Sequence, residues 1–268
     1  MNMKKGTYSK IVAGWTLVLS TLLVLASLMG LFDPHVYAQE TKNWAAQGMG
    51  QDIGNLIAAI VLVVSGYFTA KGSTKASLIW LGTVFYLMYA YTIYAMALHF
   101  NVLFLVYVAI MGFSFYGILV SISHAGISAI TPGGKAPRKL VGLTLLAISA
   151  IFELLWLSEI VPALAEGRIP QSVKDTGLLV NPVHVLDLAI VLPGLALTGY
   201  FVLKGNGTGY FFATPLLTFI ALMGSSIIAL MITMSMNGFP TTALPIAMVS
   251  TLVALSLFAM WRLIRTIV

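Results

Sequence analysis

The 268-residue sequence contains no cysteine and few charged residues, which make up 8% of the chain. Without thiols the chain has no disulfide, no thiolate metal site and no cysteine nucleophile. Soluble domains carry roughly a quarter charged residues and about half apolar ones, whereas this chain is 59% hydrophobic with a mean hydropathy of +0.98. The composition therefore predicts an integral membrane protein.

Long apolar stretches account for most of the chain. About 20 apolar residues cross the roughly 30 Å hydrocarbon layer as a helix, and the sequence offers eight such windows. They are residues 11–32, 52–70, 76–98, 101–123, 140–163, 183–203, 210–235 and 243–265. The alternation of apolar and polar residues that marks a membrane β-barrel is missing. We therefore expect an all-α fold, a polytopic membrane helix bundle with eight transmembrane helices.

The charged residues are distributed unevenly among the connections. With the N-terminus inside, eleven cations fall on the cytoplasmic side, namely Lys4, Lys5, Lys10, Lys71, Lys75, Lys135, Arg138, Lys139, Lys204, Arg262 and Arg265. Lys42, Arg168 and Lys174 fall outside, and all eight acidic residues lie in outer loops or within spans. Because cytoplasmic loops are rich in Lys and Arg, both termini are expected to be cytoplasmic. The net charge of +6 is then a topology signal, and nucleic acid is not an expected partner.

The first span also has features of a secretory signal. Lys4 and Lys5 precede an apolar stretch, and Val36-Tyr37-Ala38 resembles a cleavage site. The apolar stretch is longer than the roughly 7–15 residues of a signal core. We expect the span to be retained, while cleavage after Ala38 stays the alternative.

An internal duplication is visible near the end of two spans. The motif GYFxxKG begins at Gly66 and again at Gly199, 133 positions later, and Asp33 and Glu166 are separated by the same interval. We predict two four-helix repeats, residues 1–134 and 135–268. Four spans in each half give a parallel repeat related by an axis along the membrane normal.

Ionisable residues inside a membrane are costly and mark functional sites. Glu153 lies deepest in its span, and Glu159 lies nearer the outer end. His184 and Asp187 are three residues apart and share a helix face. These four residues and Tyr89, from a tyrosine-rich span, are the predicted substrate or ion pathway. For Asp187 a purely structural role at the positive end of the helix dipole is an equal alternative.

Pro193 and Gly194 follow the His184–Asp187 pair within the same span. Proline in a helix removes a backbone hydrogen bond and bends the axis, so we predict a helix kink here. Kinks beside carboxylates occur in transport pathways, but they are also routine in passive bundles.

Histidine supplies the remaining candidates for metal binding. His99 and His184 are expected on the outer side, where imidazole and carboxylate suit zinc, copper or iron. No HxxxH or HxH spacing supports such a site. We therefore predict no cofactor, and a haem held by these two histidines is the weakest alternative.

Three segments carry a resemblance to other proteins: Trp80–Tyr94, Asn101–Tyr107 and His184–Pro193. Together they resemble an uncharacterised family of bacterial multi-pass membrane proteins. The resemblance covers spans two to seven, and it implies a prokaryotic plasma membrane and no catalytic activity.

Three functions remain compatible with the sequence. The first is a small-solute or ion carrier with an outward-facing polar site between helices. The second is a non-transporting sensor, assembly factor or complex subunit, for which short loops are equally suitable. The third is a haem- or metal-binding membrane redox protein. The lipid bilayer is the expected partner, together with further copies of the chain or a larger membrane complex.

Overall fold

The computed structural model describes residues 5–125 and 136–267, and it confirms an all-α fold. Its elements are α1 (Lys5–Phe32), α2 (Lys42–Ala70), α3 (Thr74–Ala97), α4 (Phe104–Ala125), α5 (Arg138–Ala165), α6 (Gln171–Thr176), α7 (Pro182–Leu186), the π-helical turn η1 (Asp187–Val191), α8 (Leu192–Leu203), α9 (Gly207–Met236) and α10 (Ala243–Ile264). Eight helices are long and apolar enough to cross a membrane, with α7, η1 and α8 forming one of them. The protein is therefore an integral multi-pass membrane protein.

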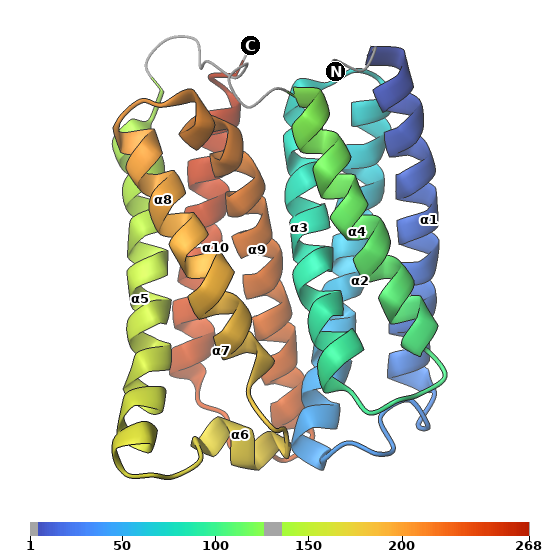
Figure 1. The fold of residues 1–268 in the computed structure, drawn as a ribbon, viewed down its shortest axis with the longest axis vertical. Coiled ribbons are helices and arrows are strands. Elements are labelled where there is room, and N and C mark those ends of the chain that lie inside the picture. The colour runs from blue at the N-terminus through green and yellow to red at the C-terminus, as the bar shows by residue number, and fades with distance from the viewer. Residues whose placement is uncertain (1–4, 126–135, 268) are drawn as a thin grey trace.

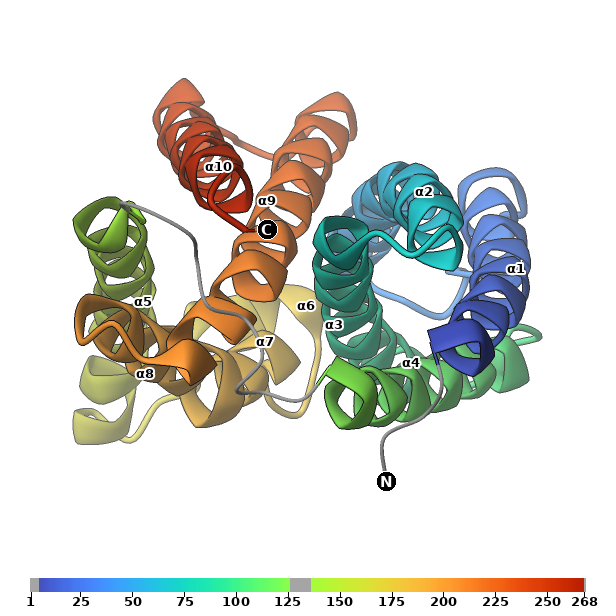
Figure 2. The ribbon, with the colours of Figure 1, turned by 90° about the horizontal axis from the view of Figure 1, so that it is seen from above.

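The eight spanning helices form two groups of four (Figures 1 and 2). In the first group α1 packs on α2, α2 on α3, α3 on α4, and α4 on α1. In the second group α5, α8, α9 and α10 contact one another in the same cyclic order. The groups meet where α9 packs against α2 and α3. Viewed from above, α1 and α5 lie at opposite outer ends, and α4 and α10 lie on opposite sides (Figure 2).

The first residue of α1, Lys5, and the last residue of α10, Ile264, lie at the same end of the bundle, which we call the termini end (Figure 1). Helix α6 crosses the opposite end, which we call the α6 end. The described cations that we predict to be cytoplasmic all belong to segments at the termini end. Of the same set, Lys4 and Lys135 lie outside the described residues. Lys42, Arg168 and Lys174 belong to segments at the α6 end.

The two GYFxxKG motifs form the same local structure at the termini end. The lysine ammonium lies over the tyrosine ring, 4.3 Å from its centroid for Lys71 and Tyr67 and 5.5 Å for Lys204 and Tyr200. The final glycine of each motif has a positive φ, 90° at Gly72 and 73° at Gly205. Such a residue ends a helix and lets the next amides bond its last carbonyls. The repeated sequence therefore encodes a repeated helix end.

The contact between the two groups depends on small residues in α2. A Cβ atom at Gly50 would overlap the backbone of Leu230, and one at Gly54 would overlap Ser226. These glycines form a GxxxG pattern, which lets helix backbones approach closely in a membrane. A buried cluster lies beside the crossing: Tyr86 donates to Asn55 (2.8 Å) and contacts the Ser226 hydroxyl at 2.7 Å.

The structure differs from the expected boundaries most clearly in α2. The predicted apolar windows 11–32 and 52–70 leave residues 33–51 as a connection, whereas α2 begins at Lys42. Its N-terminus is capped by Thr41, whose hydroxyl accepts from the Trp44 amide at 3.2 Å. Helix α2 is therefore ten residues longer than its apolar window, because its first three turns mix polar residues such as Gln47 and Gln51 with the buried residues Trp44, Ala46, Gly48 and Gly50. The connection between the windows 140–163 and 183–203 likewise contains a helix, α6.

We predict that Gly50→Ala destabilises the protein by about 1–3 kcal/mol, the usual cost of overpacking, because the new methyl group meets the α9 backbone. Gly112→Ala in α4 is the matched control, since a Cβ there has no neighbour within 4 Å. Thermal unfolding in detergent should show a lower midpoint for the first variant only. Equal midpoints would contradict the role of this crossing.

Candidate functional site

A partly open cavity of about 520 Å³ lies between the two groups of helices. It extends from Trp44 and Thr176 at the α6 end to Ile148 and Leu195, deep in the membrane-spanning part. Its walls come from every described helix except α1 and α4, and they are mainly apolar. We call this space the main cavity.

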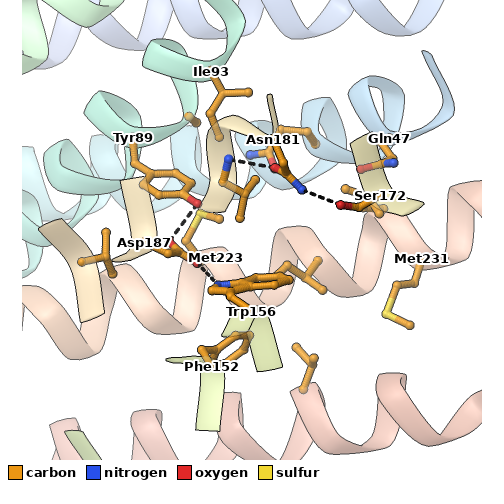
Figure 3. Close-up of a pocket in the computed structure, with 18 of the residues that line it drawn as sticks. Gln47, Tyr89, Ile93, Phe152, Trp156, Ser172, Asn181, Asp187, Met223 and Met231 are labelled. Carbon is orange, nitrogen blue, oxygen red and sulfur yellow. Dashed lines mark hydrogen bonds between the residues drawn. The ribbon is translucent and has the colours of Figure 1, made fainter. Parts of the chain in front are cut away.

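Asp187 is one of two acidic residues in the wall of the main cavity, together with Asp175 on α6 (Figure 3). Tyr89 donates its hydroxyl to one carboxylate oxygen at 3.0 Å, and Trp156 donates its indole N–H to the other at 2.8 Å. The two donors come from different helix groups, α3 and α5. Asp187 is 9% exposed, so its carboxylate is held in place and still reaches the cavity.

Local backbone geometry places Asp187. Asn181 caps α7 by accepting from the Val183 amide at 3.0 Å, with Pro182 as the first helical residue. The next turn is π-helical, and the Leu192 amide bonds to the Asp187 carbonyl. The π-helical turn ends at Val191, two residues before Pro193, which has no N–H to continue an α-helical pattern. One extra residue per turn shifts the side-chain register, and such turns occur often at functional sites.

Glu159 and His184 lie in a polar cluster next to Asp187. The His184 ring is 4.8 Å from the Trp156 ring, and its Nε2 lies 3.6 Å from a Glu159 oxygen. The other Glu159 oxygen accepts from the Ser172 amide at 2.8 Å, which holds α6 against α5. The structure thus brings together four of the five predicted pathway residues, namely Tyr89, Glu159, His184 and Asp187.

No known protein family, curated protein or solved structure matches this chain.

The fold and the site therefore stand on their own geometry. The resemblance of residues 80–94, 101–107 and 184–193 to a bacterial membrane family stays a prediction.

Glu153 lies away from the main cavity. It is exposed near the middle of α5, and no hydrogen bond to its carboxylate is made within the described residues. The cavity is lined instead by its neighbours Phe152 and Trp156. The apolar window predicts how far along its helix Glu153 lies, but not the direction in which its side chain points around that helix.

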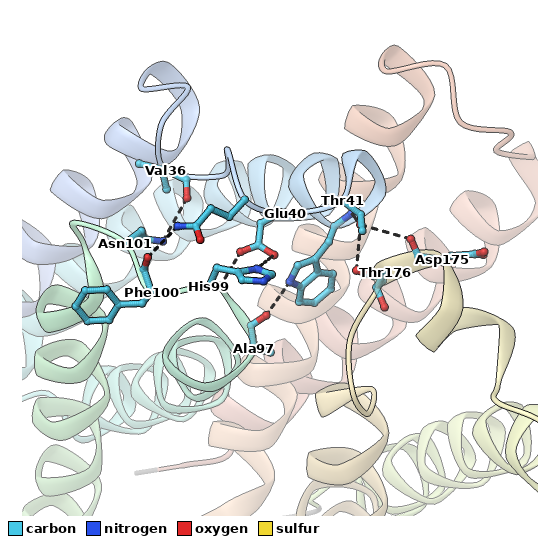
Figure 4. A network of polar contacts seen from close by, with 11 residues as sticks. Val36, Glu40, Thr41, Ala97, His99, Phe100, Asn101, Asp175 and Thr176 are labelled. Carbon is cyan, nitrogen blue, oxygen red and sulfur yellow. Dashed lines mark hydrogen bonds and ion pairs between the residues drawn. The ribbon is translucent and has the colours of Figure 1, made fainter.

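His99 lies in a network of loop contacts at the α6 end (Figure 4). Glu40 accepts from the His99 amide at 2.7 Å and contacts its ring nitrogen at 3.0 Å. In the same network Thr41 donates to the Thr176 carbonyl at 3.0 Å and so joins the two helix groups. Among the described residues no three His, Asp or Glu side chains are placed to hold a metal ion together.

Asp52 is a second buried carboxylate, which the sequence analysis did not select. It is fully buried and accepts from Tyr37 at 2.6 Å and from Tyr94 at 2.9 Å. Gly30 leaves room for it, since a Cβ there would overlap the carboxylate. The glycine-rich run from Gly48 to Gly54 was the available signal, because small residues mark close helix packing.

Tyr37 joins the 33–41 loop to the bundle. Burial and the neighbouring Asp52 carboxylate raise the pKa of the Tyr37 phenol well above its usual value of 10.0. Tyr37 therefore stays protonated and remains a donor at neutral pH. In the same loop, the amide and ring of His35 lower the pKa of the exposed Asp33.

A second cavity of about 500 Å³ lies between α3, α4, α8 and α9, and its lining is almost entirely apolar. Three residues line both cavities: Tyr89, Val191 and Phe219. The rings of Tyr89 and Phe219 meet edge to face with centroids 5.5 Å apart.

We predict that Asp52→Ala destabilises the protein, because the Tyr37 hydroxyl loses its short hydrogen bond to a buried acceptor, whereas Tyr94 keeps the Gly48 carbonyl at 3.1 Å. Each unpaired group costs about 1–3 kcal/mol. Asp52→Asn keeps an acceptor and should cost less. Thermal unfolding should rank the midpoints as wild type, Asn, then Ala; an Ala variant as stable as wild type would refute the structural role.

The raised pKa of Tyr37 gives a pH prediction. A group whose pKa is higher in the folded state contributes stability below its unfolded pKa and loses it as pH rises through the folded value. Stability should therefore fall as pH rises above 10.0, the unfolded value. Tyr37→Phe should show a shallower fall, measured as unfolding midpoint against pH. An unchanged slope would contradict this assignment.

Proposed function

We propose that the protein is a carrier for a small solute, which enters the main cavity from the α6 end. The observation that carries this proposal is a cavity shared by both helix groups with a positioned carboxylate in its wall. Its volume of about 520 Å³ falls within the roughly 300–1,000 Å³ of small-molecule sites. Glu159 holds α6 through the Ser172 amide, and the His184 ring packs against Trp156, which donates to Asp187.

The orientation in the membrane forms part of the proposal. Cations gathered at the termini end favour a cytoplasmic location for that end. Four aromatic–cation pairs lie there and suit the lipid interface: Tyr67 with Lys71, Tyr200 with Lys204, Phe258 with Arg262 and Trp261 with Arg265. The α6 end, and with it the entrance of the main cavity, then faces outward.

We also propose that the halves are a duplicated pair. The same cyclic order of helix contacts and the same GYFxxKG helix ends support a parallel repeat. Carriers built from repeats alternate access by moving one unit against the other around the site between them. The contact between α9 and α2–α3 would be the surface across which the groups move.

The absence of native cysteine allows a direct test of alternating access. Met223→Cys places one thiol in the cavity wall on α9, and Leu154→Cys places one on the lipid-facing side of α5, where Leu154 is 69% exposed. Membrane-impermeant methanethiosulfonates of either charge are applied to right-side-out and inside-out vesicles. A carrier should be labelled at position 223 from both sides and at position 154 from neither.

The outcomes separate the candidate functions. Labelling of Met223→Cys from one side only would refute transport and favour a ligand-binding sensor. Labelling from neither side would show that the main cavity is closed to water, and the proposed site would then be wrong.

A further inference from the structure

The charged residues in the lining of the main cavity are all acidic. Two acidic side chains, Asp175 and Asp187, belong to it, and the described lining contains no lysine, arginine or histidine. Within the described part of the chain, Asp187 receives hydrogen bonds only from the neutral groups of Tyr89 and Trp156. An ionised carboxylate can accept about four hydrogen bonds, so Asp187 has acceptor capacity left.

A buried carboxylate without a cationic partner is costly in a membrane protein. Asp52 is also a buried carboxylate whose hydrogen bonds come from neutral groups, but it is fully buried and held by Tyr37 and Tyr94. It does not line the main cavity, whereas Asp187 does. A positively charged ligand can therefore compensate Asp187 and has no comparable access to Asp52.

The surroundings of Asp187 are aromatic and flexible. Rings of Phe152, Trp156 and Phe219 line the same cavity, and a cation over such a ring is stabilised by its quadrupole. Met223 and Met231 add unbranched side chains that adapt to ligand shape. One carboxylate among rings suits a diffuse organic cation, whereas hard metal ions require several oxygen ligands.

We propose that the main cavity binds hydrophobic organic cations, with the positive group beside Asp187 and the apolar substituents against the aromatic and methionine side chains. This inference rests on the proposed function in one respect only, namely that the main cavity admits a solute.

The test compares two ions of the same shape and opposite charge. Binding of tetraphenylphosphonium and tetraphenylborate is measured with the full chain in lipid nanodiscs, and binding to protein-free nanodiscs is subtracted. Wild type should bind the cation more tightly by about tenfold or more, the difference expected for one charge-assisted contact. Asp187→Asn should lose that preference and Asp187→Glu should keep it.

Glu153→Gln is the matched control, because it makes the same change at an intramembrane carboxylate away from the cavity. Its affinity for the cation should equal that of wild type. Equal affinity for the two ions, or an Asp187→Asn variant with unchanged cation affinity, would overturn the proposal. An Asp187→Asn variant that fails to fold leaves the comparison of Asp187→Glu, Glu153→Gln and the two ions to decide it.

Failure of this inference is distinguishable from failure of the proposed function. Labelling of Met223→Cys from both sides without cation preference would leave a carrier whose solute belongs to another chemical class. Cation preference that depends on Asp187, with labelling from one side only, would leave a cation-binding site in a protein that does not transport.

Discussion

The close approach of α2 and α3 to α9 holds the two helix groups together. Lipid chains are as apolar as the helices, so association in a membrane depends on packing at short range. Gly50 and Gly54 remove the side chains that would separate α2 from α9, and Gly82 does the same on α3, where a Cβ would overlap the Pro215 carbonyl. The Tyr86–Asn55–Ser226 cluster adds polar contacts. The crossing also fixes α3, which lies between the groups.

Helix α3 then positions both buried carboxylates. Tyr94 bonds Asp52 in its own group, and Tyr89 bonds Asp187 in the other. The two tyrosines are five residues apart, about 7.5 Å along a helix. One carboxylate is thereby enclosed and ties the 33–41 loop to the bundle, while the other faces a cavity. This difference in exposure depends on the surroundings of the segment that carries each carboxylate, α2 for Asp52 and η1 for Asp187.

Much of this arrangement follows from the sequence, and the exceptions have physical causes. Apolar length locates the spanning helices well, but it misses the start of α2, because polar residues such as Gln47 and Gln51 are mixed with buried ones there. Position within a predicted span selects both Asp187 and Glu153 as candidate site residues. Only packing separates them, since α5 is oriented by the mutual contact of Gly142 with Gly199 on α8. Such contacts between distant residues leave no periodic pattern in one sequence.

The residues that line both cavities couple the shapes of the two spaces. Among the described residues, Tyr89, Val191 and Phe219 alone belong to the lining of both spaces. Rotamer changes are far faster than rearrangements of whole helices. Rotation of the Tyr89 and Phe219 rings therefore changes the shape of both spaces together, without a movement of whole helices.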